Sequence, residues 1–469
     1  MHKNFFRAIA VGGAFISLSG CSYFELEKLE DPNNPTLESA TDNPSKQKLD
    51  QLSTGVFSDL RTNVDGIVWY HQIAGIIGRE VYVLSTSDAR YVNEPLGTGP
   101  FSNNDFLSTR YFTTYSSARR TARILGQAAA NSQLISAEQK NAYTALAKTA
   151  EAYAMLVLSD LQYENGLRID VADPTKPGKI KPYPEVLGAI KALLDDAATL
   201  LGQSGTSLPF PVPAGFRTAA LTGGSTFSTS ANFLKFNRAL AARLGVRLAN
   251  VSGGSYSYAL AAANASFKDI AGPLTAGPRF EYGVTRPDVV NPLFTVANSN
   301  GGTVTVANPR FLSEIRTGDT RRSKVRSRTS ISRFGITSNS EPALYASNGD
   351  PIPVIKNEEL ILIAAEAHAK LGDIPQAIVE INSVARGYGL TYAPTNPTVD
   401  DVIDEILYQR RYSLFFEGQR WVDLRRLGKL DNLNVGATGK TETVNGVQST
   451  ILTSLPLPFA EVTWDASNP

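Results

Sequence analysis

The chain has 469 residues, and 42% of them are hydrophobic, so it is long and apolar enough to bury a large core. Its 45 basic and 44 acidic residues nearly balance, which gives no global electrostatic reason to expect a nucleic-acid partner. One cysteine excludes an internal disulfide, and three histidines without a P-loop, HExxH, CxxC or GxSxG pattern favour neither a metal site nor a catalytic triad, so we expect no cofactor.

The first twenty residues follow the plan of a secretory signal. Two basic residues precede an uncharged apolar stretch at residues 8–18, which has 11 residues where a membrane-spanning helix needs about 20. Ser19-Gly20 then precedes Cys21, and this order resembles a bacterial lipobox, which implies that the Cys21 thiol carries a lipid. The alternative is an ordinary signal peptide followed by a spare, buried cysteine. We predict a lipoprotein signal peptide at residues 1–20 and lipidation of Cys21.

The segment after the cysteine has the composition of a tether. Residues 21–48 contain three prolines, many polar side chains and little apolar surface, which does not support a packed core. We expect a single helical domain at residues 49–469, with packed structure beginning near Leu49.

Helical periodicity dominates the chain up to residue 266. The clearest pattern lies at residues 141–161, where apolar residues recur every 3.6 positions over five turns, and Ser136 is a candidate N-cap before it. The same period predicts further helices at residues 111–130, 184–201, 232–249 and 256–266. A stretch rich in Gly, Ser, Thr and Pro at residues 202–230 predicts a long loop.

Residues 267–350 differ in character and predict a loop-rich insert. They contain two Gly-Pro and two Asn-Pro pairs, and the alternating residues 303–306 indicate a short strand. The insert also holds a basic run at residues 316–333, for which we predict a solvated surface segment.

Helix returns with a hairpin pattern. Residues 357–371 and 375–385 each carry an apolar face rich in alanine, and Gly372-Asp373 separates them, which predicts two closely packed antiparallel helices. The stretch resembles a tetratricopeptide repeat. Residues 111–161, residues 184–201 with 232–249, and residues 400–427 could supply further hairpins, about four in all.

Charged and aromatic residues alternate near the C-terminus, at residues 408–426. On one continuous helix the charged residues would stack along one side as alternating signs, so we predict a half-buried ladder of structural ion pairs and no catalytic role. The residues of this ladder are Arg410, Glu417, Arg420, Asp423 and Arg426.

This segment resembles the closing motif of the SusD/RagB family. The resemblance rests on Phe416-Glu417-Gly418-Gln419-Arg420-Trp421 and on Asp423-Leu424-Arg425-Arg426, with the lipobox, the tether and the hairpin in matching places. It implies a mostly α fold of about four tetratricopeptide-like hairpins and a variable, loop-rich half with short strands that holds the ligand. It also implies an outer-membrane lipoprotein that acts with a SusC-like TonB-dependent transporter, commonly on carbohydrate.

Two places depart from the family pattern. Tyr412-Ser413 replaces the more usual charged pair, and residues 159–163 stand where many members have a Tyr-Gly-Asp turn. Neither affects the predicted fold. The family's ligand-binding residues follow no fixed motif, so the cargo stays open.

A sugar has apolar C–H faces and polar edges, so its site needs flat aromatic rings beside charged or amide groups. Loop-rich stretches at residues 65–99, 279–294 and 343–350 offer both, although each aromatic residue could instead pack into the core. The candidate ligand contacts are Trp69, Tyr70, Arg79, Tyr82, Asp88, Arg90, Tyr91, Tyr282, Arg286 and Tyr345.

Three functions are compatible with these features. The one we favour is a non-catalytic receptor, anchored by lipid to the surface of the outer membrane, that captures an oligosaccharide or similar oligomeric nutrient for the transporter. A surface glycoside hydrolase would need two carboxylates across a cleft, for which Asp88 and Glu281 are the candidates. A tetratricopeptide scaffold would bind only protein.

Overall fold

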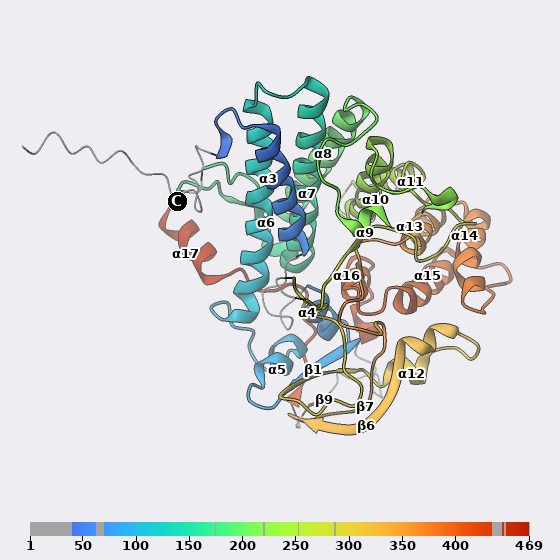
Figure 1. Ribbon diagram of the computed structural model, residues 1–469. Helices are drawn as coiled ribbons and strands as arrows, with labels where there is room; N and C mark the ends of the chain where they lie inside the picture. The colour runs from blue at the N-terminus through green and yellow to red at the C-terminus, as the bar shows by residue number, and fades with distance from the viewer. Residues whose placement is uncertain are drawn as a thin grey trace, which may run out of the picture.

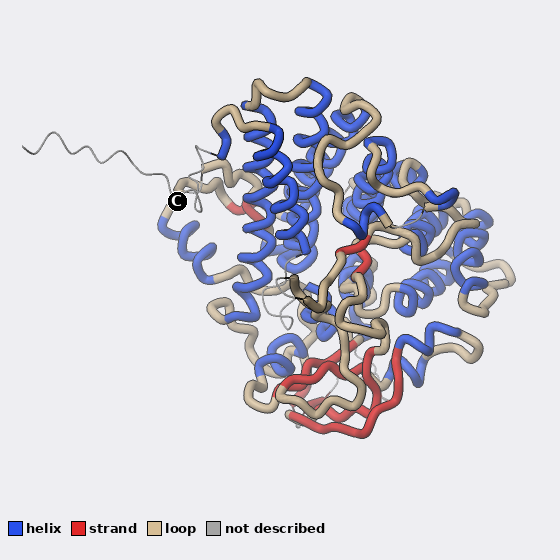
Figure 2. Tube along the Cα trace, in the orientation of Figure 1, coloured by secondary structure: helices blue, strands red, loops and turns tan. Residues whose placement is uncertain are grey.

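Packed helices form most of the molecule, and the longer strand pairs lie at one end of it (Figures 1 and 2). The computed structural model describes residues 40–61, 70–173, 175–218, 221–251, 253–285, 288–433, 443–444 and 447–468. The predicted signal peptide and Cys21, most of the predicted tether, Trp69 and Arg286 lie outside the described residues.

One group of long helices stands side by side at the upper left of Figure 1. α6 packs against α7, α3 covers both of them, and α8 packs against α7. Ser136 caps α7 as predicted, because its hydroxyl accepts a hydrogen bond from the backbone N–H of Gln139 and the Gln139 side chain accepts one in return. The bounds of these helices are α3 Lys46–Arg61, α6 Phe106–Asn131, α7 Ala137–Gln162 and α8 Tyr183–Gly202.

A second group of helices continues the stack on the right of Figure 1. α8 contacts α10, α10 contacts α11 and α13, and α13 contacts both α14 and α15. The mostly α, hairpin-based fold predicted from periodicity is therefore confirmed. The bounds are α10 Ser230–Leu248, α11 Ser257–Asn264, α13 Asn357–Lys370, α14 Ile374–Gly387, α15 Val399–Ser413 and α16 Gln419–Arg426.

The strands are short and pair in twos at the places where the helical stack is interrupted. All of the described pairs are antiparallel, and β1 with β5 and β6 with β7 lie at the bottom of Figure 2. The pairs are β1 Val81–Ser85 with β5 Thr303–Ala307, β6 Val325–Arg333 with β7 Ile336–Pro342, β4 Arg279–Phe280 with β8 Ile352–Pro353, β2 Leu167–Arg168 with β3 Ile180–Lys181, and β9 Thr443–Val444 with β10 Val447–Gln448. Short helices complete the fold: α4 Tyr70–Ile77, α5 Arg90–Leu96, α9 Ala214–Arg217, α12 Arg310–Glu314 and α17 Phe459–Ser467, with 3₁₀ turns at Tyr163–Asn165, Thr222–Gly224, Thr320–Lys324 and Leu430–Leu433.

Two predictions about loops were incomplete. Residues 202–230 contain α9, and Phe216 in this helix packs edge-on against Phe57 and Phe236 at ring-centroid distances of 5.3 Å, so the stretch contributes to the core. The basic run at residues 316–333 is not simply solvated. Its Arg328 is buried with Glu341, which the β6–β7 hairpin brings opposite.

The predicted single helix at residues 408–426 is wrong, because α15 ends at Ser413 and α16 begins only at Gln419. Gly418 between them has φ 74°, in the left-handed region that breaks a right-handed helix and that glycine adopts most readily. Arg410 and Asp423 are buried, whereas Glu417, Arg420 and Arg426 are partly exposed, so the charges are on the whole more buried than a half-buried ladder.

The break redistributes the predicted ion pairs. Asp423 lies between two arginines of the motif, 2.6 Å from Arg410 and 2.8 Å from Arg426. Glu417 instead lies 2.6 Å from Lys356, and the Arg420 Nε–H donates to the Gly78 carbonyl at 3.0 Å. The motif therefore links several parts of the chain and forms no continuous ladder.

Buried ion pairs also join the two helical groups. Asp160 on α7 accepts from Arg247 on α10 at 2.7 Å, and both side chains are almost completely shielded from solvent. One helical turn away, Arg243 pairs with Glu359 on α13 at 2.6 Å. Since an unpaired buried charge is strongly destabilising, these pairs fix how α7, α10 and α13 lie against one another.

We expect the Asp160→Asn variant to lose about 3–5 kcal/mol of unfolding free energy, because it leaves the buried Arg247 guanidinium without its carboxylate. Urea unfolding of the full chain measures the change. Asp404→Asn is the matched control: Asp404 pairs with Lys429 at the surface, so the same substitution should cost less than about 1 kcal/mol there. Equal losses at the two sites would contradict the structural role given to the buried pair.

Stability should also fall on acidification because of His71 in α4. Burial, and secondarily the nearby Arg243, lowers the pKa of His71 to about 3. Below about pH 6.5 the unfolded chain binds a proton at this residue, whereas the folded protein keeps the imidazole neutral. The free energy of unfolding therefore falls by about 1.4 kcal/mol for each pH unit below that point.

The His71→Gln variant should lack this contribution. Between pH 6.5 and 5, its unfolding free energy should fall by about 2 kcal/mol less than that of the wild type. Comparing the two chains cancels the carboxylates that titrate in the same range. Identical pH slopes would show that His71 is not held neutral.

Candidate functional site

Three of the predicted ligand contacts belong to the protein interior. Tyr70, Arg79 and Tyr82 are 4%, 4% and 2% exposed. The Tyr70 hydroxyl donates to the Gly418 carbonyl at 3.1 Å, and the Tyr82 hydroxyl accepts from the Asn308 amide at 2.7 Å. The Arg79 guanidinium donates to backbone carbonyls of its own turn and of α5. Their expected contact with a ligand is therefore corrected: all three are core residues that hold loops in place.

Asp88, Arg90 and Tyr91 do come together, at the start of α6. Arg90 binds Asp88 through two nitrogens, at 3.0 and 2.7 Å, and its guanidinium lies 4.8 Å from the centre of the Phe106 ring. Tyr91 packs edge-on against the same ring at 5.1 Å. These three residues are partly or largely exposed, so they present an aromatic and charged surface.

The Asp88 carboxylate is not suited to act as a catalytic acid. Its hydrogen bonds from Arg90 lower the pKa of Asp88, so it stays ionised at neutral pH. Glu281, its proposed partner in a hydrolase, belongs to another cluster, where it lies against Gly215 of α9 and next to Tyr282. The described residues also show no group of three or more His, Cys, Asp or Glu arranged to hold a metal ion.

A second cluster of predicted residues gathers where α3 ends. Arg61, the last residue of α3, pairs with Asp288 at 2.8 Å, donates to the Glu281 carbonyl at 2.8 Å and lies 5.8 Å from the centre of the Tyr282 ring. Burial raises the pKa of Tyr282. The loop that follows Tyr345 lies against this segment, because a Cβ at Gly349 would come within 3.3 Å of the Val284 side chain and 3.9 Å of the Tyr282 carbonyl.

This cluster stands on loops that are tied to each other. The backbone N–H of Asn291 donates to the Asn348 carbonyl at 2.7 Å, and its side-chain amide donates to the Asp350 carbonyl at 2.8 Å. Asp350 in turn accepts from the backbone N–H groups of Ala346 and Ser347. Residues 282–285 and 288–294 therefore form one supported surface with residues 343–350.

We name this surface the Tyr345 face, defined by Arg61, Tyr282, Val284, Asp288 and Tyr345. Tyr345 is half-buried, Val284 is 66% exposed and the Asp288 side chain is 38% exposed. The Tyr282 hydroxyl is buried and has no hydrogen-bond partner among the described residues. The face thus combines a partly exposed ring, an apolar rim and an ion pair, which are groups that a sugar's faces and edges require.

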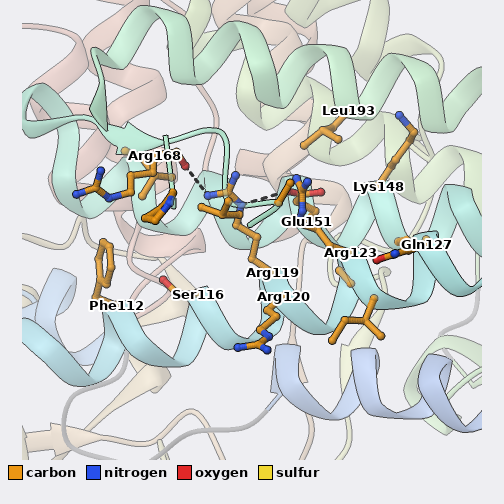
Figure 3. Close-up of a pocket in the computed structure, with 18 of the residues that line it drawn as sticks. Phe112, Ser116, Arg119, Arg120, Arg123, Gln127, Lys148, Glu151, Arg168 and Leu193 are labelled. Atoms are coloured by element: carbon orange, nitrogen blue, oxygen red, sulfur yellow. Dashed lines mark hydrogen bonds and ion pairs between the residues drawn. The ribbon is translucent and has the colours of Figure 1, made fainter. Parts of the chain in front are cut away.

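A large groove, which the sequence did not indicate, runs beside α6 and α7 (Figure 3). Its volume is about 950 Å³, within the usual range for ligand sites. α6 and α7 form its floor, and residues 167–177 and α17 form its sides. We call it the α6–α7 groove. Most of its residues lie on regular helices, where periodicity indicates packing and gives no sign of a cavity.

Comparison with known proteins gives the same family as the sequence motif. Residues 298–454 match the model of the SusD family. Among solved structures, the chain is similar to a SusD superfamily protein from Bacteroides thetaiotaomicron, with a TM-score of 0.66, 15% identity, and 91% of this chain and 100% of that chain covered. No curated protein matches the chain.

Two other similar structures have more specific names. NanU from B. fragilis has a TM-score of 0.64 and 16% identity, with 94% of this chain and 98% of that chain covered. Surface glycan-binding protein A from B. thetaiotaomicron has a TM-score of 0.65 and 13% identity, with 92% and 98% covered. At these identities the structural likeness establishes the fold, and the family assignment rests on the matched segment.

Proposed function

This chain is a member of the SusD/RagB family, and from that premise we propose that it is a lipid-anchored receptor of the outer membrane, exposed at the cell surface, that binds an oligosaccharide or similar oligomeric nutrient and delivers it to a SusC-like TonB-dependent transporter. The proposed role is non-catalytic. The neighbour named as a surface glycan-binding protein supports glycan as the ligand class.

The Tyr345 face carries the ligand-binding part of this proposal. The partly exposed Tyr345 ring there shares a surface with the Arg61–Asp288 ion pair and the exposed Val284 side chain, on loops that hydrogen bonds hold in place. Such a surface can stack on the apolar side of a sugar ring and satisfy its hydroxyls at the same time, with little ordering cost. Asp88, Arg90 and Tyr91 offer a similar set of groups at the start of α6 and remain a secondary proposal.

Anchoring and delivery rest on the N-terminal motif and on the family. Cys21 follows a signal-like sequence, and residues 22–39 separate it from the first described residue, Ala40. In the part of the chain that the structure describes, no helix combines the length and apolar character needed to cross a bilayer. The stacked hairpins provide broad surfaces of the kind that helical-repeat proteins use to contact partners.

Glycan binding should depend on the ring of Tyr345. In a binding assay against a panel of neutral and acidic oligosaccharides, we expect at least one ligand whose affinity falls about tenfold in Tyr345→Ala, a loss of about 1.4 kcal/mol, because the stacking surface is removed. Isothermal titration calorimetry of the detergent-purified full chain gives the dissociation constants.

Tyr345→Phe is the matched control, because it keeps the ring and should retain most of the affinity. Tyr91→Ala tests the other aromatic cluster on the same ligand. The products are also analysed by mass spectrometry after long incubation. No binding by any glycan, or cleavage of the bound glycan that is lost in Asp88→Asn, would refute the receptor proposal.

Lipid attachment should determine where the protein is found. In a bacterium of the kind in which the SusD-like structures were found, the wild-type chain should incorporate labelled fatty acid and fractionate with the outer membrane, and Cys21→Ser should do neither, because its hydroxyl cannot replace the thiol as the lipidation site. The same membrane fraction, captured through this chain, should contain a TonB-dependent transporter. Identical fractionation of the two chains would contradict the anchoring proposal.

A further inference from the structure

The α6–α7 groove is a separate feature from the Tyr345 face. The groove is formed by α6, α7, α17 and residues 167–177, whereas the face is formed by the end of α3 and the loops at 282–294 and 343–350. Nothing in the receptor proposal uses the groove. Its size and its position on the rigid helical frame nevertheless give it the properties of a binding site.

The most exposed charges on the α6–α7 side of the groove are basic. Arg123 on α6 is 36% exposed and Lys148 on α7 is 30% exposed, while the Glu151 side chain is only 8% exposed. Arg119 and Arg123 both bind the same oxygen of Glu151, at 3.1 Å each, so two guanidiniums share one carboxylate. Figure 3 shows these side chains gathered between the two helices, with Arg120 directed away from them.

The α17 wall carries the opposite imbalance. Glu461 and Asp465 on α17 both bind Arg168, at 2.6 and 2.5 Å, and the Arg168 side chain is 5% exposed. Lys148 pairs with Asp196, whose side chain is 61% exposed, so solvent screens that pair. The positive charge is therefore local to the α6–α7 side of the groove, around Arg123, where two guanidiniums share one carboxylate.

Aromatic and apolar side chains share the lining with these charges. Trp464 of α17 is half-buried in the groove wall, and Phe112, Ile124 and Leu193 also line it. A ligand that fits this surface must combine anionic groups with flat apolar faces and must be extended enough to lie along a helix pair. An oligosaccharide of uronic or sulfated sugars has these properties, since each ring offers a C–H face and a charged edge.

We infer that the α6–α7 groove is a second binding site, and that it takes an acidic oligosaccharide through the guanidinium of Arg123, the ammonium of Lys148 and the ring of Trp464. The choice of glycan over acidic peptide rests on the proposed receptor function. The preference for an anionic ligand does not depend on that proposal, because it follows from the exposed basic side chains Arg123 and Lys148.

The test compares acidic and neutral probes on the full chain. Hexagalacturonate and a chondroitin sulfate hexasaccharide are titrated against maltohexaose and hexaglutamate. We expect at least one acidic oligosaccharide to bind, with an affinity that falls steeply between 50 and 200 mM salt because the contacts are ionic. The double variant Arg123→Gln/Lys148→Gln should weaken that binding at least tenfold, and Trp464→Ala should weaken it severalfold.

Two controls separate the groove from the Tyr345 face. Lys370→Gln removes an exposed positive charge on α13 and should leave binding unchanged. Tyr345→Ala should also leave it unchanged, although it is expected to weaken binding at the other face about tenfold. The inference is overturned if no acidic oligosaccharide binds, if binding is insensitive to the groove variants, or if hexaglutamate binds equally well. Glycan binding that is weakened only by Tyr345→Ala would refute the groove as a second binding site, and it would leave the receptor proposal intact.

Discussion

The need to pair buried charges constrains the whole helical frame. Arg247 on α10 is bound by Asp160 on α7, Arg243 on α10 is bound by Glu359 on α13, and the Arg426 guanidinium of α16 is bound by Glu366 on α13. Each pair joins two helices, and a shift of either helix would leave a buried charge without its partner, which costs several kcal/mol of stability. The chain of pairs therefore fixes one arrangement of α7, α10, α13 and α16, and the loops attached to these helices inherit that arrangement.

Local patterns predicted the helices well, because helical periodicity depends only on residues three or four positions apart in the sequence. The pattern at residues 141–161 appears in the structure as α7, with its N-cap at Ser136. The partners of the charged residues could not be predicted in this way. Glu417 was expected to pair within its own helix, but Gly418 breaks that helix and turns Glu417 towards Lys356, far away in the sequence. The pairing depends on tertiary packing that no local period records.

The same distinction separates the parts of the candidate site. Asp88 and Arg90 are two residues apart, so their association follows from the local sequence. Tyr70 and Tyr82 have the composition of loop aromatics, and only the packing of α4 and β1 into the core shows that they are unavailable. The role of Arg61 could not be predicted at all, because its contacts with residues 281–288 join segments that are more than two hundred positions apart.

The two surfaces differ in how they are held, and this difference follows from the architecture. The Tyr345 face is built on loops that hydrogen bonds through Asn291 and Asp350 fix to each other. One wall of the α6–α7 groove is α17, a helix with no buried residue in its described span, attached through the ion pairs of Arg168 with Glu461 and Asp465. The helix is held at its start as well, because the backbone N–H of Phe459 donates to the Asn103 carbonyl at 2.8 Å and the buried Arg168 guanidinium donates to the Glu461 carbonyl at 2.9 Å. Packed helices thus keep the basic groups of α6 and α7 in place, while polar contacts through Arg168 place α17 opposite them.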